Sequence, residues 1–145
     1  MALYDLIVKN VRVVSPNKDT VETLDVAIKD GKFAALAPEI LADDGAEVFD
    51  GKGMLGMPGA IDPHTHVGIY VPPHDDAPTE SAAAAQGGVT TIIPYVRTGS
   101  LYLNMGGSLT EFFPELLRQS EGRYYIDYAY HVSPITGSQV KEMEY

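Results

Sequence analysis

The pattern that most constrains this chain begins after Pro58, where strand-like and helix-like segments alternate. Residues 59–71 form an apolar run suited to a buried strand. Residues 89–96 (VTTIIPYV) and 123–135 (RYYIDYAYHVSPI) have the β-branched and aromatic composition of strands. Between them, residues 79–88 (TESAAAAQGG) and 108–122 (SLTEFFPELLRQSEG) are typical of helices. The order β-α-β-α-β predicts parallel βαβ units, and therefore an α/β fold.

Capping residues set the expected limits of these two helices. Thr79 is a candidate N-cap for the first, and Gly87 or Gly88 is a candidate stop. Ser108 followed three residues later by Glu111 forms a capping-box pattern at the start of the second. A third helix is expected to begin within residues 137–145.

Residues 3–55 differ from this pattern and consist of strands. Asn10 sits where a turn or bulge would divide the first strand-like segment. Asp30-Gly31 is a hairpin dipeptide between two runs with alternating polarity. These features predict a small antiparallel sheet, whose apolar face needs a second layer to cover it.

The length of the chain limits what the alternating part can build. A closed β/α barrel takes eight strands and roughly 250 residues. The 145 residues contain three such strands. They therefore form either a small open sheet or one piece of a larger assembly.

Charge and composition exclude several classes of partner. The net charge is −10, which disfavours nucleic acid and anionic membranes. No cysteine is present, so disulfides and thiolate metal sites are excluded. Asp5, Lys9 and Arg12 interrupt the apolar start, and no apolar run reaches the roughly 18 residues of a membrane span. We expect a soluble cytoplasmic protein.

Two of the four histidines, His64 and His66, lie one residue apart in the apolar stretch GAIDPHTHVG. Side chains two apart on a strand point the same way, so Asp62, His64 and His66 are expected on one face. Two imidazoles placed so can converge on one metal ion. Asp62 would lie behind them as a hydrogen-bond acceptor or shape the floor of the site. The alternative is two unrelated histidines.

The segments LIVKNVRVVSP, DVAIKDGKFAAL, AEVFDGKGMLGMPGAIDPHTHV, AAAAQGGVTTII and YYIDYAYHVSPI occur here in this order. Together they resemble the amino-terminal third of the cyclic amidohydrolases of the amidohydrolase superfamily. The dihydropyrimidinase/hydantoinase branch is the most similar, with allantoinase and dihydroorotase as relatives. The most specific element is the block G-x-I-D-x-H-x-H with the Pro-Gly that precedes it.

The resemblance implies a fold and a metal centre. Residues 1–56 would belong to a β-sandwich domain, and residues 57–145 would form the first strands and helices of an incomplete TIM-type (β/α)8 barrel. Family members hold two divalent metal ions, commonly zinc, bridged by a carboxylated lysine. His64 and His66 match the first two metal ligands. The bridging lysine and the catalytic aspartate match no residue of this segment, so no catalytic residue is assigned.

Other residues are assigned smaller roles. Ile69 and Tyr70 follow the histidine pair in the loop that shapes the family's substrate pocket. His131 stands near the end of the third strand, where it would line the pocket, hydrogen-bond behind the metal ligands, or simply pack in the barrel. His74 is expected in a solvated, acidic, Pro-rich loop.

The leading hypothesis is an enzyme that hydrolyses a cyclic amide, such as a dihydropyrimidine or hydantoin ring, with metal-bound hydroxide. It would need the carboxyl-terminal remainder of the barrel, as a separate or missing chain, and the resemblance implies a homotetramer. Two alternatives are a non-catalytic dihydropyrimidinase-like scaffold protein and a small β/α binding module.

Overall fold

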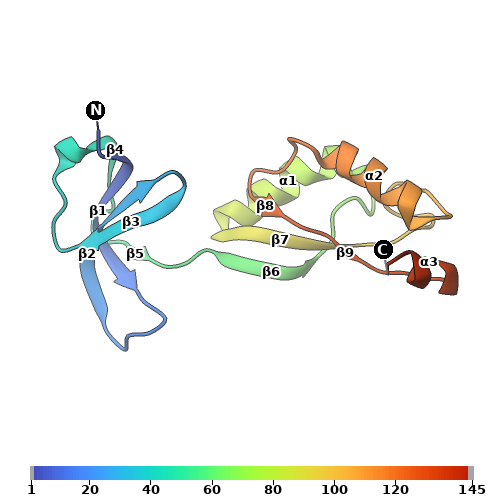
Figure 1. Cartoon of the computed structure of the whole chain (residues 1–145), viewed down its shortest axis with the longest axis horizontal. Coiled ribbons are helices and arrows are strands. Elements are labelled where there is room, and N and C mark those ends of the chain that lie inside the picture. Colours follow the sequence, from blue (N-terminus) through green and yellow to red (C-terminus); the bar gives the residue numbers. More distant parts are fainter. Residues whose placement is uncertain (1, 144–145) are drawn as a thin grey trace. The chain divides into compact units, whose positions relative to one another are not determined.

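A computed structural model describes residues 2–143, which fall into two compact units divided between Pro58 and Gly59 (Figure 1). The described part of the first unit contains strands and one short 3-10 helix. Strands and helices alternate in the second, so the chain is of the mixed α/β class. Within residues 2–143, no helix combines the length and the apolar character needed to cross a membrane.

The first unit is a five-stranded sheet. Its order is β3-β2-β1-β4, with the short β5 also paired to β1. The elements are β1 (Tyr4–Val14), β2 (Val21–Lys29), β3 (Lys32–Ala37), η1 (Ala42–Asp44), β4 (Gly45–Asp50) and β5 (Leu55–Gly56). The predicted antiparallel sheet is right for β1, β2 and β3 but wrong for β4 and β5, which run parallel to β1. The segment between β3 and β4 is long enough to carry the chain back, so β4 starts at the same end as β1.

Three residues with a left-handed backbone explain one turn and one bulge of this sheet. Asp30 and Gly31 have φ of 51° and 70°, as a two-residue hairpin turn requires, which confirms the hairpin between β2 and β3. Asn10 has φ of 55°, and the pairing of β1 with β2 shifts register between Val8 and Val11. Asn10 therefore marks a bulge within one continuous strand.

A buried carboxylate joins three parts of the first unit. Asp25 on β2 is 3 % exposed and accepts hydrogen bonds from Lys9 Nζ at 2.5 Å and from the main-chain N–H groups of Asn10 and Ile40, each at 2.9 Å. Lys9 also donates to the Ile40 carbonyl at 2.6 Å. Burial opposes ionisation of Asp25, but these donors outweigh it and hold the pKa of Asp25 below its ordinary value. The pair ties the β3–β4 connection to the sheet.

We expect Asp25→Asn to lower the local stability of the first unit by about 3 kcal/mol, because Lys9 and two main-chain donors lose a charged acceptor. Hydrogen-exchange protection of the β1 and β2 amides measures this change. Asp5→Asn is the matched control, since Asp5 forms an exposed pair with Lys29 and its loss should leave protection nearly unchanged.

The pH dependence follows from the depressed pKa. The contribution of Asp25 is present above pH 3.8, its ordinary pKa, and is lost as the pH falls through the lower folded value. Asp25→Asn should therefore lose less protection than the unmodified protein on acidification through this window. An equal loss in both would contradict the role given to Asp25.

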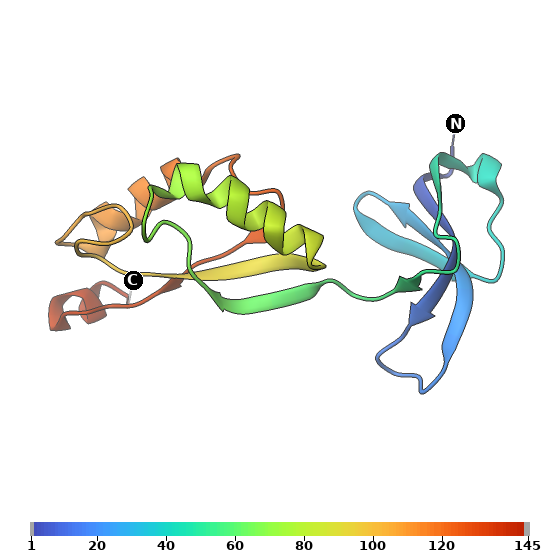
Figure 2. The same ribbon diagram turned by 180° about the vertical axis from the view of Figure 1, so that it is seen from behind.

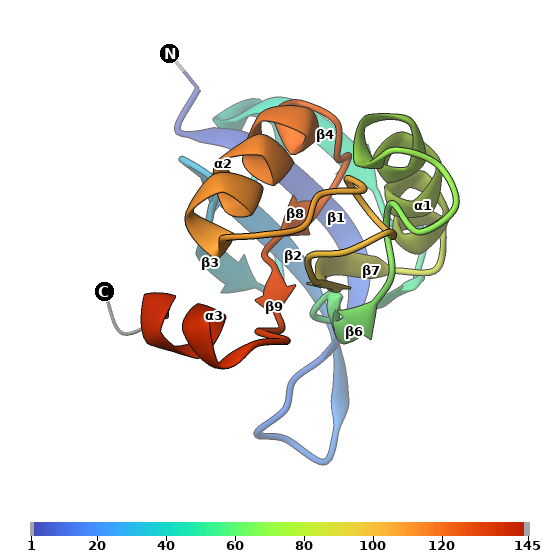
Figure 3. The same ribbon diagram turned by 90° about the vertical axis from the view of Figure 1, so that its right-hand side faces the viewer.

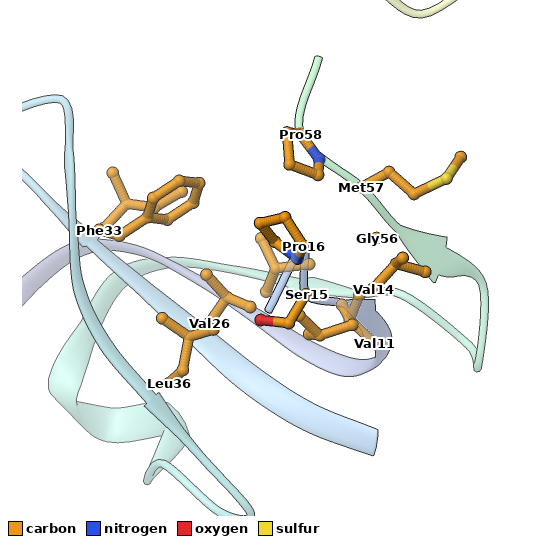
Figure 4. Close-up of a pocket in the computed structure, with 13 residues that line it drawn as sticks. Val11, Val14, Ser15, Pro16, Val26, Phe33, Leu36, Gly56, Met57 and Pro58 are labelled. Atoms are coloured by element: carbon orange, nitrogen blue, oxygen red, sulfur yellow. The ribbon is translucent and has the colours of Figure 1, made fainter. Parts of the chain in front are cut away.

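The sheet of the first unit carries apolar side chains on both faces. On one face, Ile7 and its cross-strand partner Ala27 pack with Ile40 in a buried cluster. On the other face, Val8 pairs with Val26 beside an open apolar hollow (Figure 4). The hollow is lined mainly by aliphatic and aromatic side chains, among them Val11, Val26, Phe33, Leu36, Met57 and Pro58. Phe33 is 76 % exposed, so within the described residues of the first unit no second layer covers this face, as one normally covers such a sheet.

The second unit consists of parallel βα repeats. Its elements are β6 (Ala60–Thr65), α1 (Pro73–Gln86), β7 (Val89–Val96), α2 (Leu109–Ser120), β8 (Asp127–Tyr128), β9 (His131–Val132) and α3 (Gly137–Glu142). β7 lies in the middle, with β6 parallel on one side and β8 and β9 parallel on the other. Helices α1 and α2 lie over one face of this sheet (Figures 2 and 3). The predicted succession of parallel units is confirmed.

Helix α1 begins six residues before the expected N-cap. Thr79 lies inside the helix, where its hydroxyl donates to the Asp76 carbonyl, so its assignment as N-cap is wrong. Pro73 occupies the first turn, a position that suits proline because its missing N–H would have no helical partner there. His74 is therefore helical and does not lie in a loop. Helix α2 begins after Ser108 as expected, with the Ser108 hydroxyl accepting from Thr110 N–H.

The core of the second unit lies between the sheet and the two helices. Val96 packs with Leu109, Phe112 and Leu116 of α2. Ile92 packs with Ala77 of α1 and with Val67. Alternate residues of β7 are buried under the helices, so its remaining side chains face away from them.

Candidate metal-binding site

Parallel pairing brings the carboxyl ends of the second unit's strands to one edge. Thr65 of β6 is in register with Pro94 of β7, and Tyr95 is in register with His131 of β9. His64 and His66 flank Thr65, and Tyr95 follows Pro94. By alternation these histidines share a face with Tyr95 and His131, opposite the face of Pro94 that is buried under the helices.

Three imidazoles surround the ring of Tyr95 on this face. The ring centroids of His64 and His66 are 5.3 Å apart, and those of His64 and His131 are 6.3 Å apart. The Tyr95 centroid is 5.9 Å from His64, 5.7 Å from His66 and 6.3 Å from His131. The structure thus brings the histidine pair together and adds His131 beside it.

Asp62 acts on the main chain of the pair. Its Oδ1 accepts from the His64 backbone N–H at 3.0 Å. The pairing of β6 shifts register between Asp62 and Thr65, so the strict alternation that predicts one face for Asp62, His64 and His66 is interrupted. The hydrogen bond of Asp62 lies at this register shift, and it goes to the main chain of His64 and not to its ring.

Tyr102 is a contact of the site that the sequence analysis missed. Its hydroxyl lies 3.2 Å from Nδ1 of His66, and the residue is 8 % exposed. Burial raises the pKa of Tyr102 above its ordinary value, and the nearby Tyr95 adds to this. The available signal was the position of Tyr102 in the loop after the second strand, at the end where active sites of such folds gather.

The loop of residues 97–107 that carries Tyr102 is fastened by Gln139 of α3. Gln139 is 2 % exposed, and its Nε2 donates to Thr98 Oγ1 at 2.8 Å and to the Gly107 carbonyl at 2.6 Å. Its Oε1 accepts from Ile135 N–H at 2.8 Å. The side chain closes both ends of the loop.

Comparison with known proteins shows which proteins this chain is similar to. No family model matches the chain. A D-hydantoinase of Geobacillus stearothermophilus is 36 % identical over 124 residues, which cover 82 % of this chain and 25 % of that protein. An allantoinase of Escherichia coli is 40 % identical over 91 residues, 62 % of this chain and 19 % of that protein.

Solved structures of hydantoinases are similar to this chain as well. The L-hydantoinase (dihydropyrimidinase) from Arthrobacter aurescens matches with a TM-score of 0.76 and 29 % identity, over 97 % of this chain and 31 % of that one. A D-hydantoinase structure matches with a TM-score of 0.76 and 31 % identity, over 97 % of this chain and 30 % of that one. The chain belongs to the cyclic amidohydrolases. It spans about a quarter of the length of the D-hydantoinase that it matches.

The donor set of this cyclic amidohydrolase chain suits a divalent metal in part. Neutral imidazole nitrogen is a good ligand for zinc and similar ions, and both histidines of the pair are solvent-exposed residues. Within residues 2–143, no group of three His, Asp or Glu side chains is arranged to hold a metal. The pair fits such an ion but needs further ligands.

The remaining candidate residues lie around the pair in different surroundings. Ile69 is half-buried against the core under α2, whereas Tyr70 is 95 % exposed. Gly68 lies between the histidine pair and Ile69 in the sequence, and its N–H donates to the Asp76 carboxylate at 2.7 Å. His74 lies on α1 with its Nδ1 3.1 Å from Gln119 Oε1.

We expect Gln139→Leu to destabilise the 97–107 loop by about 2 kcal/mol, because Thr98, Gly107 and Ile135 lose buried hydrogen-bond partners. Faster hydrogen exchange in residues 97–107 would show this. Gln86→Leu, at the exposed end of α1, is the control and should leave the loop unchanged.

Proposed function

We propose that this chain takes part in the metal-dependent hydrolysis of a cyclic amide, such as a dihydropyrimidine, a hydantoin or a related ring, and supplies the first two metal ligands. The observation that carries this proposal is the imidazole pair His64 and His66, whose rings lie 5.3 Å apart at the carboxyl end of β6. Membership of the cyclic amidohydrolases supplies the reaction class.

The same proposal extends to the fold. Residues from 59 onward would be the first β/α units of a TIM-type (β/α)8 barrel, and the first unit would be part of a β-sandwich. Sequential parallel strands with helices on one face, and the histidines at the carboxyl ends, support the barrel. The open apolar hollow supports a second sheet over the first unit.

His64 and His66 would hold one of two divalent ions, zinc being the first choice, bridged by a carboxylated lysine from outside the described residues. Such ions supply hydroxide at neutral pH and polarise the amide carbonyl. The role proposed for the residues of this chain is to bind the ion and to orient the substrate. Tyr95 lies beside both His66 and His131, with ring centroids 5.7 Å and 6.3 Å away. Ile69 and Tyr70 would border the substrate ring.

We expect His64→Ala and His66→Ala to lower metal content and to reduce the rate of hydantoin or dihydropyrimidine ring opening by more than about 100-fold, because each removes a direct ligand. Elemental analysis and a ring-opening assay measure the two effects. His74→Ala is the matched control, since that histidine lies on α1 against Gln119. Full turnover in His64→Ala would show that the assignment is wrong.

The remaining barrel strands would come from further polypeptide, either continuous with this sequence or a separate chain, in a homo-oligomer. Native mass spectrometry of the purified protein tests this. We expect an assembly whose protomer contains at least the roughly 250 residues of a closed barrel. A stable, isolated 145-residue monomer that binds no metal would contradict it.

A non-catalytic dihydropyrimidinase-like scaffold is the alternative that the same metal measurement separates. The enzyme requires about two metal ions per protomer. A scaffold would carry none and would show no turnover with or without added zinc.

A further inference from the structure

Each imidazole of the pair has two nitrogens, and only one can face a given metal ion. In His66, Nδ1 already has a neighbour, the hydroxyl of Tyr102 at 3.2 Å. In His64, the backbone N–H donates to Asp62 Oδ1, and within residues 2–143 no hydrogen bond reaches its ring nitrogens. The two histidines are therefore held differently, and His66 alone has a ring nitrogen engaged.

The Tyr102 hydroxyl is fixed in place by its surroundings. Tyr102 has φ of 61°, a left-handed conformation that disfavours a bulky side chain by about 1–2 kcal/mol. The loop is closed by a bond from Gly99 N–H to the Met105 carbonyl at 2.6 Å, and by Gln139 at its two ends. The Tyr102 ring packs 6.4 Å from that of Tyr95. The loop thus keeps an unfavourable backbone conformation at Tyr102, the residue whose hydroxyl contacts His66.

The chemistry of imidazole gives this contact a consequence. A neutral imidazole carries its proton on one nitrogen and a free electron pair on the other. A phenol oxygen can accept a hydrogen bond, so Nδ1–H of His66 can donate to Tyr102. Nε2 then has the free electron pair that binds a metal. Histidine ligands commonly donate their second N–H in this way, and the partner sets the tautomer.

We infer that Tyr102 is a positioning residue for His66: its hydroxyl accepts from Nδ1–H, fixes the ring and its tautomer, and leaves Nε2 to bind the metal ion. This rests on the proposed role of His66 as a ligand. The gain is preorganisation, because the ring is oriented before the ion arrives. His64 receives no such orientation through its ring.

The tautomer of His66 gives a direct test that a purely structural role would not affect. Long-range proton–nitrogen NMR correlations, recorded without metal where imidazole is neutral, identify the protonated nitrogen. We expect Nδ1–H in the unmodified protein and a shift toward Nε2–H in Tyr102→Phe, which keeps the aromatic ring and removes the hydroxyl. The His64 tautomer should stay unchanged and serves as the internal reference.

Binding of zinc ion alone gives the second measurement. We expect Tyr102→Phe to weaken zinc binding about 10-fold and to speed zinc release to a chelator, the usual effect of losing such a partner. Tyr125→Phe is the matched control, since Tyr125 is 75 % exposed and only its main chain bonds to Ser81. Its zinc affinity should equal that of the unmodified protein.

The outcomes separate this inference from the proposed function. Zinc bound through His66, with affinity and tautomer unchanged in Tyr102→Phe, would overturn the inference and leave the function standing. Absence of zinc binding in the unmodified protein would overturn the proposed function, and with it the role toward metal. Should Tyr102→Phe not fold, an Nε2–H tautomer in the unmodified protein would by itself overturn the inference.

Discussion

The parallel pairing of β7 with its neighbours is the constraint on which the candidate site depends. Because β6 and β9 run in the same direction as β7, residues near their carboxyl ends meet at one edge of the sheet. The register then decides which side chains become neighbours, and it sets Tyr95 beside His131. Burial of Ile92, Pro94 and Val96 under the helices leaves the opposite face of β7 for the histidines.

Local sequence signals predicted those parts of the fold that depend on a few adjacent residues. The Asp30-Gly31 hairpin is confirmed because both residues tolerate a left-handed backbone. Signals that depend on context failed. The prolines around His74 suggested a loop, yet α1 includes His74 and continues through Pro78. The direction of β4 could not be predicted, since it depends on how the preceding connection is anchored at Ile40 by Asp25.

The same distinction between local and context-dependent signals applies to the candidate site. The spacing of His64 and His66 was visible in the sequence because both lie on one short segment. Tyr95 and Tyr102 were not identified, since their contacts with the pair join residues about thirty or more positions apart. Gln139 was invisible for the same reason, being separated by 41 positions from Thr98. Spacing along a strand predicts possible ligands, whereas the group that contacts the ring of His66, Tyr102, is brought there by tertiary structure.

In the proposed metal site, orientation and coordination would therefore have different structural origins. Asp62 bonds the main chain of His64, and Tyr102 bonds the ring of His66, so both histidines are constrained by residues of their own unit. Completing a metal centre requires ligands that the described residues do not bring to the pair. A site of this kind gains affinity when ordering costs are met before the ion binds. In the proposed metal site, the Tyr102 hydroxyl would orient the ring of His66 before the ion binds, which would reduce what the other ligands must order and would make the loop of residues 97–107 part of the site.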